Sequence, residues 1–246
     1  MIGRTDVEAA WRLIQPHVRR TPALELPAGS LGVRAPVALK LESLQVSGSF
    51  KGRGAFHKLL ASKVPAAGII AASGGNHGAA AAFAARALGH KAEIFVPTIA
   101  SPAKVARLKD YGAVVHQVGA VYAEARAASE KRAVETEGTP TLHEARRAGR
   151  PVEVKISGIA ADALGASRIG VPNFEVAQKL VRDSVLVSDD AVRQAQRALW
   201  EELRVIAEPA GATGLAALMA GVYRPAPGER VATLICGANT EPGLVA

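Results

Sequence analysis

Residues 67–97, AGIIAASGGNHGAAAAFAARALGHKAEIFVP, determine the fold class. They begin with a short apolar run, 67–73, of the kind that is buried in a parallel sheet. A glycine-bearing turn follows at 73–78, and then an alanine-rich segment of high helix propensity that ends at Gly89. A second strand pattern occupies 91–97. Strand, helix and strand in this order predict two parallel strands joined by a right-handed crossover.

The alternation continues beyond this segment. Pro102 opens a helical pattern, a strand pattern covers 113–118, and a further helical pattern covers 120–133. Strand and helix therefore repeat three times in residues 67–133, which predicts an α/β fold with parallel strands. The other expected elements are less regular: an N-terminal helix after Asp6, strands at 36–43, 184–189 and 229–237, and helices at 189–203 and 207–221.

The chain has 246 residues and a mass of 25.4 kDa, enough for one large domain or two small ones. Its 49% hydrophobic and 21% charged residues are typical of a globular protein. Only 4% are aromatic, so we expect a core of aliphatic residues and alanine. The formal net charge is +8, but the basic residues are scattered and are not interleaved with aromatic ones. This pattern argues against nucleic-acid binding and allows only a mild attraction to anionic ligands.

Cys236 is the single cysteine, which excludes an intramolecular disulfide and a cysteine-based zinc site. The N-terminal sequence MIGRTDVEAAWRLI has no apolar core of a signal peptide. No apolar run approaches the ~18 residues of a membrane span. A cytoplasmic protein without a membrane association is the default expectation.

The first candidate functional segment is 47–54, SGSFKGRG, in which Lys51 follows a glycine turn and begins a helix. A lysine amine has an ordinary pKa of ~10.4, so it is a poor nucleophile at neutral pH unless burial or a neighbouring positive charge lowers that pKa. A lysine activated in this way can trap a carbonyl group as a Schiff base. Taken alone, the segment is more often a surface lysine in a glycine loop. It lacks the spacing of a phosphate-binding P-loop.

The second candidate segment is 73–78, SGGNHG, between a buried strand and a helix. The amides and the dipole of a helix N-terminus attract anions, and glycines let a ligand approach the backbone closely. The alternative is an ordinary strand–helix turn with Ser73 or Asn76 as its N-cap. His77 by itself is more often a structural hydrogen-bonding residue than a general base.

Two further segments lie in the second half of the chain. Glu208 and Pro209 open a helix, for which a proline-started helix is the simpler interpretation. Cys236 and Gly237 follow the last expected strand, at the end where open α/β sheets bind ligands. An isolated cysteine there is more often a small buried hydrophobic residue.

Together, these segments occur in an order that resembles the serine/threonine dehydratase family, which are pyridoxal-phosphate enzymes of the tryptophan-synthase-β fold type. The resemblance covers nearly the whole chain. It implies two parallel-sheet α/β domains, a large cofactor-binding domain formed by 1–48 plus 134–246 and a small domain formed by 49–133. It is carried by LKLESLQVSGSFKGRGA (39–55), AASGGNHGAAAAFAARALG (71–89), AEPAGATGLAAL (207–218) and LICGAN (234–239), with support from RRTPALEL (19–26), 97–119 and 134–149.

The resemblance also implies a cofactor site. Lys51 would bind pyridoxal 5'-phosphate as a Schiff base and later act as the base at the substrate Cα. Phe50 would flank the pyridine ring, and Asn76 would hydrogen-bond the phenolic oxygen. A neutral thiol at the pyridine nitrogen would leave the ring unprotonated and moderate its electron withdrawal. That thiol would be Cys236. Glu208 would lie near the ring edge, and Gly237 is also expected among the cofactor-binding residues.

The substrate side follows from the same resemblance. Ser73, Gly75, Asn76 and His77 would bind the carboxylate of an amino acid. The implied reaction is β-elimination, which converts L-threonine or L-serine to a 2-oxo acid and ammonia. Serine racemases resemble this pattern but have a second serine where this chain has Gly74, so racemisation is disfavoured. A homodimer is expected.

The resemblance is interrupted where 129–133 (SEKRA) runs directly into 134–140 (VETEGTP). Roughly 60 residues or more are missing there, the equivalent of about two strand–helix–strand units. They would include the glycine-rich loop whose backbone N–H groups surround the cofactor phosphate. The alternative function is therefore a catalytically impaired or inactive relative that binds an amino acid or acts as a scaffold. The join is consistent with a natural or engineered deletion, a degraded paralogue, or residues omitted from the sequence.

Two hypotheses depend on this interruption and on the segment that follows it. The glycines within 210–214, or Gly237, would partly replace the lost phosphate loop. Racemase-like relatives place a divalent cation near an acid that Glu135 matches, but Thr141 occupies the second acid position. We therefore predict no strongly held metal.

Overall fold

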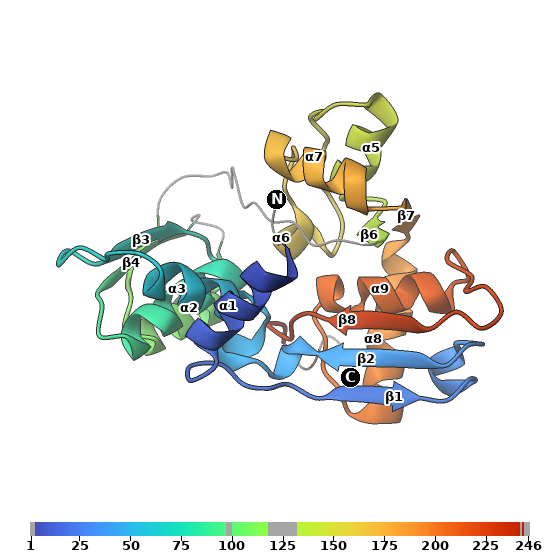
Figure 1. Ribbon diagram of the computed structural model, residues 1–246, viewed down its shortest axis with the longest axis horizontal. Helices are drawn as coiled ribbons and strands as arrows, with labels where there is room; N and C mark the ends of the chain where they lie inside the picture. The colour runs from blue at the N-terminus through green and yellow to red at the C-terminus, as the bar shows by residue number, and fades with distance from the viewer. Residues whose placement is uncertain (1–2, 97–99, 118–131, 242, 244–246) are drawn as a thin grey trace. The chain divides into compact units, whose positions relative to one another are not determined.

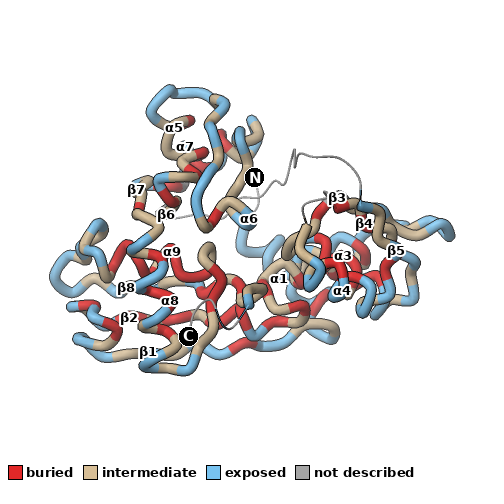
Figure 2. Tube along the Cα trace, turned by 180° about the vertical axis from the view of Figure 1, so that it is seen from behind, coloured by how far each residue is buried: buried red, intermediate tan, exposed pale blue. Residues whose placement is uncertain are grey.

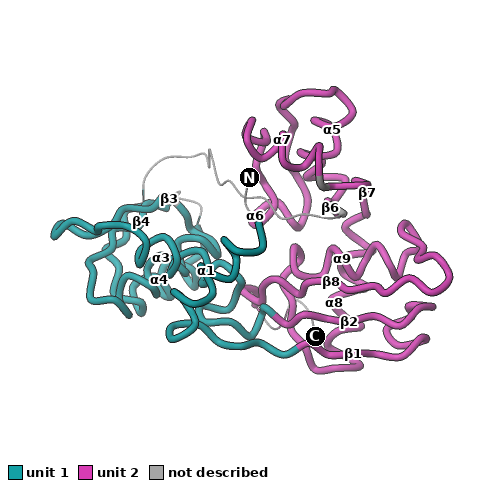
Figure 3. Tube along the Cα trace, in the orientation of Figure 1, with its two compact units in different colours: residues 1–22, 42–122 teal, residues 23–41, 123–246 magenta. Residues whose placement is uncertain are grey.

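The structure is a computed structural model that describes residues 3–96, 100–117, 132–241 and 243. Its chain forms two compact units (Figure 3), of which unit 1 comprises residues 1–22 and 42–122 and unit 2 comprises 23–41 and 123–246. The expected division assigned 1–48 to the large domain, whereas the contacts group 1–22 and 42–48 with the smaller unit. Which unit binds the cofactor stays a prediction.

Unit 1 is built on a parallel sheet with strand order β3-β4-β5 among its described residues (Figure 1). β3 (Ile69–Ala72) pairs with β4 (Ala92–Val96), which pairs with β5 (Val114–Gln117). The strand–helix repeat predicted for 67–133 is thereby confirmed as far as residue 117, and its last helix lies outside the described residues. The helices of the unit are α1 (Arg4–Ile14), α2 (Lys51–Leu60), α3 (Asn76–Ala87) and α4 (Pro102–Asp110).

The core of unit 1 is made mainly of small side chains. Every alanine of α3 except Ala87 is buried, in the helix that Figure 2 labels α3, and Phe56, Ile94 and Leu108 fill the space around them. Alanine-lined helices approach a sheet closely, so few aromatic rings are needed to fill the core. This agrees with the aliphatic and alanine-rich core that the composition predicts.

Unit 2 contains two sheets among its described residues. β1 (Ala23–Leu26) lies antiparallel to β2 (Val37–Leu41), and β2 lies parallel to β8 (Val231–Ile235). The second sheet pairs β6 (Arg132–Thr136) with β7 (Asp183–Val187) in parallel. Its helices are α5 (Thr141–Ala148), α6 (Ala161–Leu164), α7 (Val171–Leu180), α8 (Asp189–Leu203) and α9 (Pro209–Met219).

Helix α9 joins the two sheets of unit 2, because it packs against β8, β6 and β7. Its own Leu215 lies in one core cluster with Leu39, Leu199 and Ile235, and all four side chains are fully buried. A two-stranded parallel sheet is too small to be stable by itself. The β6–β7 pair therefore depends on this packing for its stability.

Three predicted element bounds are corrected. The N-terminal helix expected after Asp6 begins at Arg4, with Gly3 as its N-cap. The helix predicted for 120–133 extends too far, because Arg132 begins β6; residues 120–131 lie outside the described residues. The strand predicted for 36–43 ends at Leu41, and a 3-10 turn, Glu42–Leu44, replaces its last part. Within the described residues, no helix has the length and apolar character needed to cross a membrane.

Two helical glycines of unit 1 provide a test of the packing. Gly54 on α2 is exposed and has no atom near an added methyl group, so Gly54→Ala should raise the free energy of unfolding by about 0.5–1 kcal/mol through helix propensity. On α3, a methyl group on Gly78 would overlap the carbonyl oxygen of Ser73. Gly78→Ala should therefore lower that free energy by about 1–3 kcal/mol. Urea unfolding followed by circular dichroism measures both free energies. If Gly78→Ala stabilised the protein as much as Gly54→Ala, the close approach of Ser73 to α3 would be contradicted.

Candidate functional site

Lys51 is the first residue of α2, and the chain reaches it through an unusual turn. Ser47 and Gly48 both have left-handed backbones, with φ of 62° and 75°. Glycine adopts this conformation freely, but a serine there costs about 1–3 kcal/mol and persists only where its surroundings enforce it. Ser49 then returns to an extended conformation and is fully buried. The predicted glycine turn before the lysine is thus present, and it contains one strained residue.

The first turn of α2 lies directly against this bend. A methyl group on Gly52 would lie 2.9 Å from Val46 Cγ2 and 3.0 Å from the Val46 carbonyl oxygen. Only glycine allows this approach, so its neighbour Lys51 is held close to the bend. The Lys51 amine lies 4.6 Å from the centroid of the Phe50 ring. Phe50 therefore provides an aromatic face beside the amine.

The second candidate segment forms the connection from β3 to α3. Ser73 is buried, and its Oγ accepts a hydrogen bond from the Gly75 N–H at 3.3 Å. Gly75 is the N-cap of α3, and Asn76 and His77 are its first two residues. The N-cap position has no side chain to satisfy the first N–H groups of the helix. Such a helix start is suited to binding an anion, and the carboxylate site expected here stays a prediction.

The two candidate segments of unit 1 lie near one another. Helix α2 packs against α3, and the charge of Lys51 acts on the His77 ring. Partial burial of the ring first, and the Lys51 charge second, lower the pKa of His77, even though the residue as a whole is exposed. A lowered pKa keeps the imidazole neutral at neutral pH, where it can donate or accept a hydrogen bond.

The remaining predicted site residues lie in unit 2, around the end of β8. Glu208 is buried at the start of α9, and its Oε2 accepts a hydrogen bond from the Asn239 N–H at 3.2 Å. The Glu208 N–H donates to the Gly237 carbonyl oxygen at 3.0 Å. A methyl group on Gly237 would overlap the Glu208 carboxylate, so a larger residue there would displace that carboxylate. Cys236 directly follows β8 and is half-buried. The structure thus brings Glu208, Cys236 and Gly237 together, and their contact with the cofactor stays a prediction.

The glycines proposed to replace the phosphate loop have another function. A methyl group on Gly211 would lie 2.7 Å from the Gly237 carbonyl oxygen, and one on Gly214 would overlap Thr233 Oγ1. Both glycines therefore permit close packing of α9 on β8. This packing by itself accounts for the two glycines, and the hypothesis of a substitute phosphate loop stays a prediction. The residues present fit the aldehyde end of pyridoxal phosphate, which Lys51 can bind. Among the described residues, no run of glycines remains that could bind its phosphate through backbone N–H groups.

Glu135, the candidate metal ligand, is occupied by backbone contacts. Its two carboxylate oxygens accept hydrogen bonds from the N–H groups of Leu142 and His143, each at 2.8 Å. It thereby anchors the first turn of α5 to β6. Burial raises the pKa of Glu135, although these N–H donors oppose the effect. Within the described ranges, no group of three or more His, Cys, Asp or Glu side chains could hold a metal ion.

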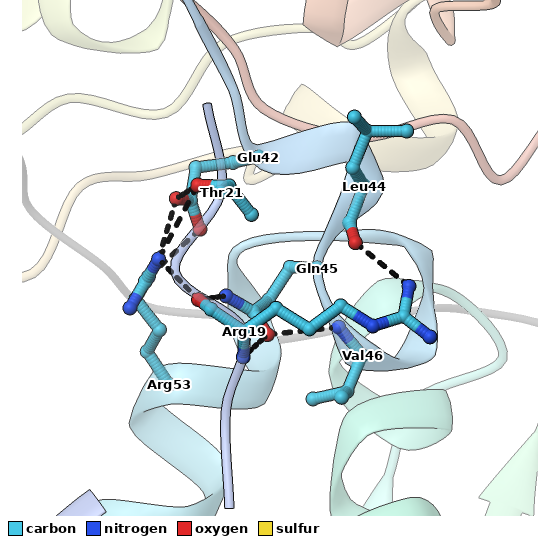
Figure 4. A network of polar contacts seen from close by, with 7 residues as sticks. All are labelled: Arg19, Thr21, Glu42, Leu44, Gln45, Val46 and Arg53. Atoms are coloured by element: carbon cyan, nitrogen blue, oxygen red, sulfur yellow. Dashed lines mark hydrogen bonds and ion pairs between the residues drawn. The ribbon is translucent and has the colours of Figure 1, made fainter. Parts of the chain in front are cut away.

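Sequence reasoning assigned no function to a set of polar residues beside Lys51. Arg53 donates to both carboxylate oxygens of Glu42, and the Gln45 side chain binds the backbone of Arg19 (Figure 4). Glu42 and Gln45 are buried. The sequence gives one signal for Glu42 and Gln45, which is that both occur within LKLESLQV (39–46). Polar residues that become buried there are retained only where they have hydrogen-bond partners.

The chain matches the family described as pyridoxal-phosphate dependent enzyme, over residues 14–133 and again over 132–237. It is 31% identical to the phenylserine dehydratase of Ralstonia pickettii, over 93% of this chain and 90% of that protein. It is 27% identical to an L-threonine ammonia-lyase of Thermotoga maritima, over 100% of this chain and 77% of that protein.

Solved structures give the same result for the fold. A threonine deaminase of T.th. superposes with a TM-score of 0.85 and 26% identity, over 98% of this chain and 99% of that one. Maize serine racemase superposes with a TM-score of 0.84 and 23% identity, over 96% of this chain and 93% of that one, which supports the fold alone.

The comparisons also locate the internal deletion. The alignment with the R. pickettii protein has 295 positions, but 93% of 246 residues is about 229, so about 66 positions have no counterpart in this chain. The two family matches meet at residues 132–133, so the missing part falls at the join that the sequence indicates.

The proximity of Lys51 and His77 can be tested by titration. Lys51→Met should raise the pKa of His77, because it removes a positive charge, but should leave it below its ordinary value because the burial remains. NMR of the ring protons measures the pKa, with a His77→Asn variant to assign the signal. Lys58→Met, at an exposed position on the same helix, is the control and should change nothing. A His77 pKa unaffected by Lys51→Met would contradict the geometry.

The match over most of the chain, the relative above 30% identity and the superposed folds agree. The fold is that of the tryptophan-synthase-β-like enzymes, shortened by an internal deletion. The chain belongs to the family of pyridoxal-phosphate-dependent enzymes.

Proposed function

We propose that this protein is a pyridoxal-phosphate-dependent ammonia-lyase that acts on L-threonine, L-serine or a related β-hydroxy amino acid, with a 2-oxo acid and ammonia as products. The relatives named as a phenylserine dehydratase, an L-threonine ammonia-lyase and a threonine deaminase support this reaction class. The observation that carries the proposal is the proximity of the Lys51 amine to the start of α3 within one compact unit.

The candidate site residues of unit 1 have separate chemical roles under this proposal. The N–H groups at the start of α3 bind the substrate carboxylate, and Ser73, Gly75, Asn76 and His77 surround it. When bound, pyridoxal phosphate withdraws electrons from the amino acid and makes its α-proton acidic. The Lys51 amine takes that proton, and the neutral His77 ring adds no positive charge beside the amine.

The residues of unit 2 are proposed to contact the cofactor ring. Cys236 is assigned to the pyridine nitrogen, as a neutral thiol that does not protonate the ring. Glu208 is assigned to the ring edge, and its hydrogen bond from Asn239 keeps the carboxylate in one orientation. Gly237 leaves room beside this carboxylate that a larger residue would fill.

Racemisation is the competing reaction, because serine racemases share the fold. The difference is assigned to Gly74, which provides no hydroxyl to return a proton from the opposite face. A methyl group at Gly74 would meet Ala100 and Val96 at 3.6–3.7 Å, an ordinary contact distance. Packing therefore does not require glycine here, and its lack of a hydroxyl agrees with a lyase.

The proposal predicts turnover that depends on Lys51. Purified protein with added pyridoxal phosphate should release 2-oxo acid and ammonia from L-threonine, L-serine or L-phenylserine. Lys51→Ala should reduce this rate by about 10²–10⁴-fold, because the base at Cα is lost. Lys58→Ala on the same helix is the matched control. Equal product formation by Lys51→Ala, or none by a parent protein that has bound the cofactor, would overturn the proposal.

The second candidate is a catalytically impaired relative that binds an amino acid or serves as a scaffold. It is favoured by the absence of about 66 aligned positions and by the glycines of α9 that pack against β8. A phosphate held by several backbone donors contributes several kcal/mol to binding, because each charge-assisted hydrogen bond contributes about 1.5–3 kcal/mol.

Loss of the phosphate loop has a measurable consequence for affinity. Pyridoxal phosphate should bind less than about tenfold more tightly than pyridoxal, since the phosphate finds few donors. Quenching of the tryptophan fluorescence during titration measures both affinities. A preference for the phosphorylated form above about a hundredfold would show that other residues hold the phosphate.

A further inference from the structure

The polar residues beside Lys51 form one connected network within unit 1 (Figure 4). Arg53 Nε and Nη2 donate to the two carboxylate oxygens of Glu42 at 2.8 and 2.7 Å. The Thr21 hydroxyl donates to Glu42 Oε1, and Arg53 Nη2 reaches the Arg19 carbonyl oxygen at 3.3 Å. The network thereby links helix α2 to two segments that are distant from it in sequence.

Gln45 fixes the bend that precedes the lysine. Its side-chain amide donates to the Arg19 carbonyl oxygen and accepts from the Arg19 N–H, both at 2.8 Å. The same Gln45 oxygen accepts the Val46 N–H at 2.9 Å. Val46 in turn lies against Gly52 in the first turn of α2. The hydrogen bonds of Gln45 therefore also hold the bend against the start of the helix.

The strained residue Ser47 lies in the sequence between Gln45, which makes these hydrogen bonds, and Lys51. A left-handed serine persists only where neighbouring contacts enforce it, and such strain is concentrated at functional positions. The contacts that flank it are those of Gln45 on one side and of Arg53 on the other. The network therefore accounts for a backbone that the local sequence does not favour.

The helix geometry connects Arg53 to the direction of Lys51. With 3.6 residues per turn, side chains two positions apart project from nearly opposite sides of a helix. The pairing of Arg53 with the buried Glu42 fixes one side of α2 against the Glu42–Leu44 turn. It thereby sets the rotation of the helix about its axis, which determines where Lys51 points.

A buried ion pair is poor evidence for a purely stabilising role. Replacing such a pair with apolar residues of similar size is often neutral or stabilising, because the desolvation of two charges is avoided. A bidentate arginine–carboxylate pair does provide a defined geometry. Geometry is what a reacting lysine requires, since a misplacement of about 1 Å can cost about a hundredfold in rate.

We propose that Arg53, Glu42 and Gln45 are positioning residues that orient the Lys51 amine toward its carbonyl partner. The proposal rests on the proposed function of Lys51 as the lysine that binds the cofactor aldehyde. These residues contact neither substrate nor cofactor in this account. They act through the backbone of the bend and through the rotation of α2.

The test uses the full chain without cofactor, in an Arg53→Met/Glu42→Leu double variant that removes both charges. Pyridoxal is added, borohydride traps any Schiff base, and peptide mass spectrometry measures the rate at Lys51. NMR measures the pKa of His77, which reports whether the Lys51 charge is still nearby. The control, Arg4→Met/Glu8→Leu, removes an exposed ion pair of the same kind, Arg4 Nε to Glu8 Oε1 at 2.7 Å, on α1.

The double variant should remain folded, and trapping at Lys51 should fall by about tenfold or more while the His77 pKa rises. The control variant on α1 should match the parent in both measurements. A folded double variant with parental trapping and a parental His77 pKa would overturn the proposal. If the double variant does not fold, Arg53→Lys takes its place in the test. Lysine keeps the positive charge but cannot donate to both Glu42 oxygens in the planar geometry of arginine. Undiminished trapping at Lys51 in this variant would also overturn the proposal.

Failure of the proposed function gives a different result. If Lys51 is not the lysine that binds the aldehyde, pyridoxal will be trapped in the parent at Lys51 no faster than at Lys58. The His77 pKa of the variants then still shows whether Arg53 and Glu42 hold the Lys51 side chain in place. An unchanged value in the folded double variant overturns the positioning proposal, and a raised value upholds it.

Discussion

The position of Lys51 depends on one backbone constraint, the two consecutive left-handed residues Ser47 and Gly48. They turn the chain from the Glu42–Leu44 segment into α2 within a few residues, so that the lysine begins the helix. The lysine thus stands at the first position of α2, and its amine lies 4.6 Å from the centroid of the Phe50 ring. The same bend therefore places the amine beside an aromatic face.

The candidate site follows the usual logic of α/β folds, in which ligands bind where strands end and helices begin. The start of α3 follows β3, and Glu208, Cys236 and Gly237 meet where β8 ends and α9 begins. Close approaches at glycines hold each half: Gly52 and Gly78 lie against the backbone of Val46 and Ser73 in unit 1, and Gly237 lies against the Glu208 carboxylate in unit 2. The internal deletion leaves both of these local arrangements in place. What it removes lies between β5 and β6 in the sequence.

The sequence predicts unit 1 well because its signals are local. Short apolar runs alternate with alanine-rich helices, and the glycines fall where strand meets helix. Unit 2 is harder to predict, because β1 is far in the sequence from most of its unit and β6 begins at the join itself, where no periodicity can be established. Their pairing partners, β2 and β7, are supplied by tertiary contacts.

The candidate site shows the same division. Lys51, Asn76 and Glu208 stand in recognisable motifs, whereas the pairing of Arg53 with Glu42 joins residues eleven positions apart and is visible only in three dimensions. The glycines within 210–214 are candidates for a substitute phosphate loop, and the structure shows that Gly237 and Thr233 fill the space beside Gly211 and Gly214. A glycine motif indicates that something approaches closely, and only the structure identifies whether that partner is a ligand or the protein itself.

The central claim is that the lysine half of a pyridoxal-phosphate site persists in this shortened chain. It is tested most directly by the visible absorption spectrum of the purified protein with added pyridoxal phosphate. The account predicts that the parent gains the absorption band of cofactor bonded to a lysine, that borohydride removes the band, and that Lys51→Ala does not gain it. A parent without the band, or a Lys51→Ala variant with an equal one, would contradict the account.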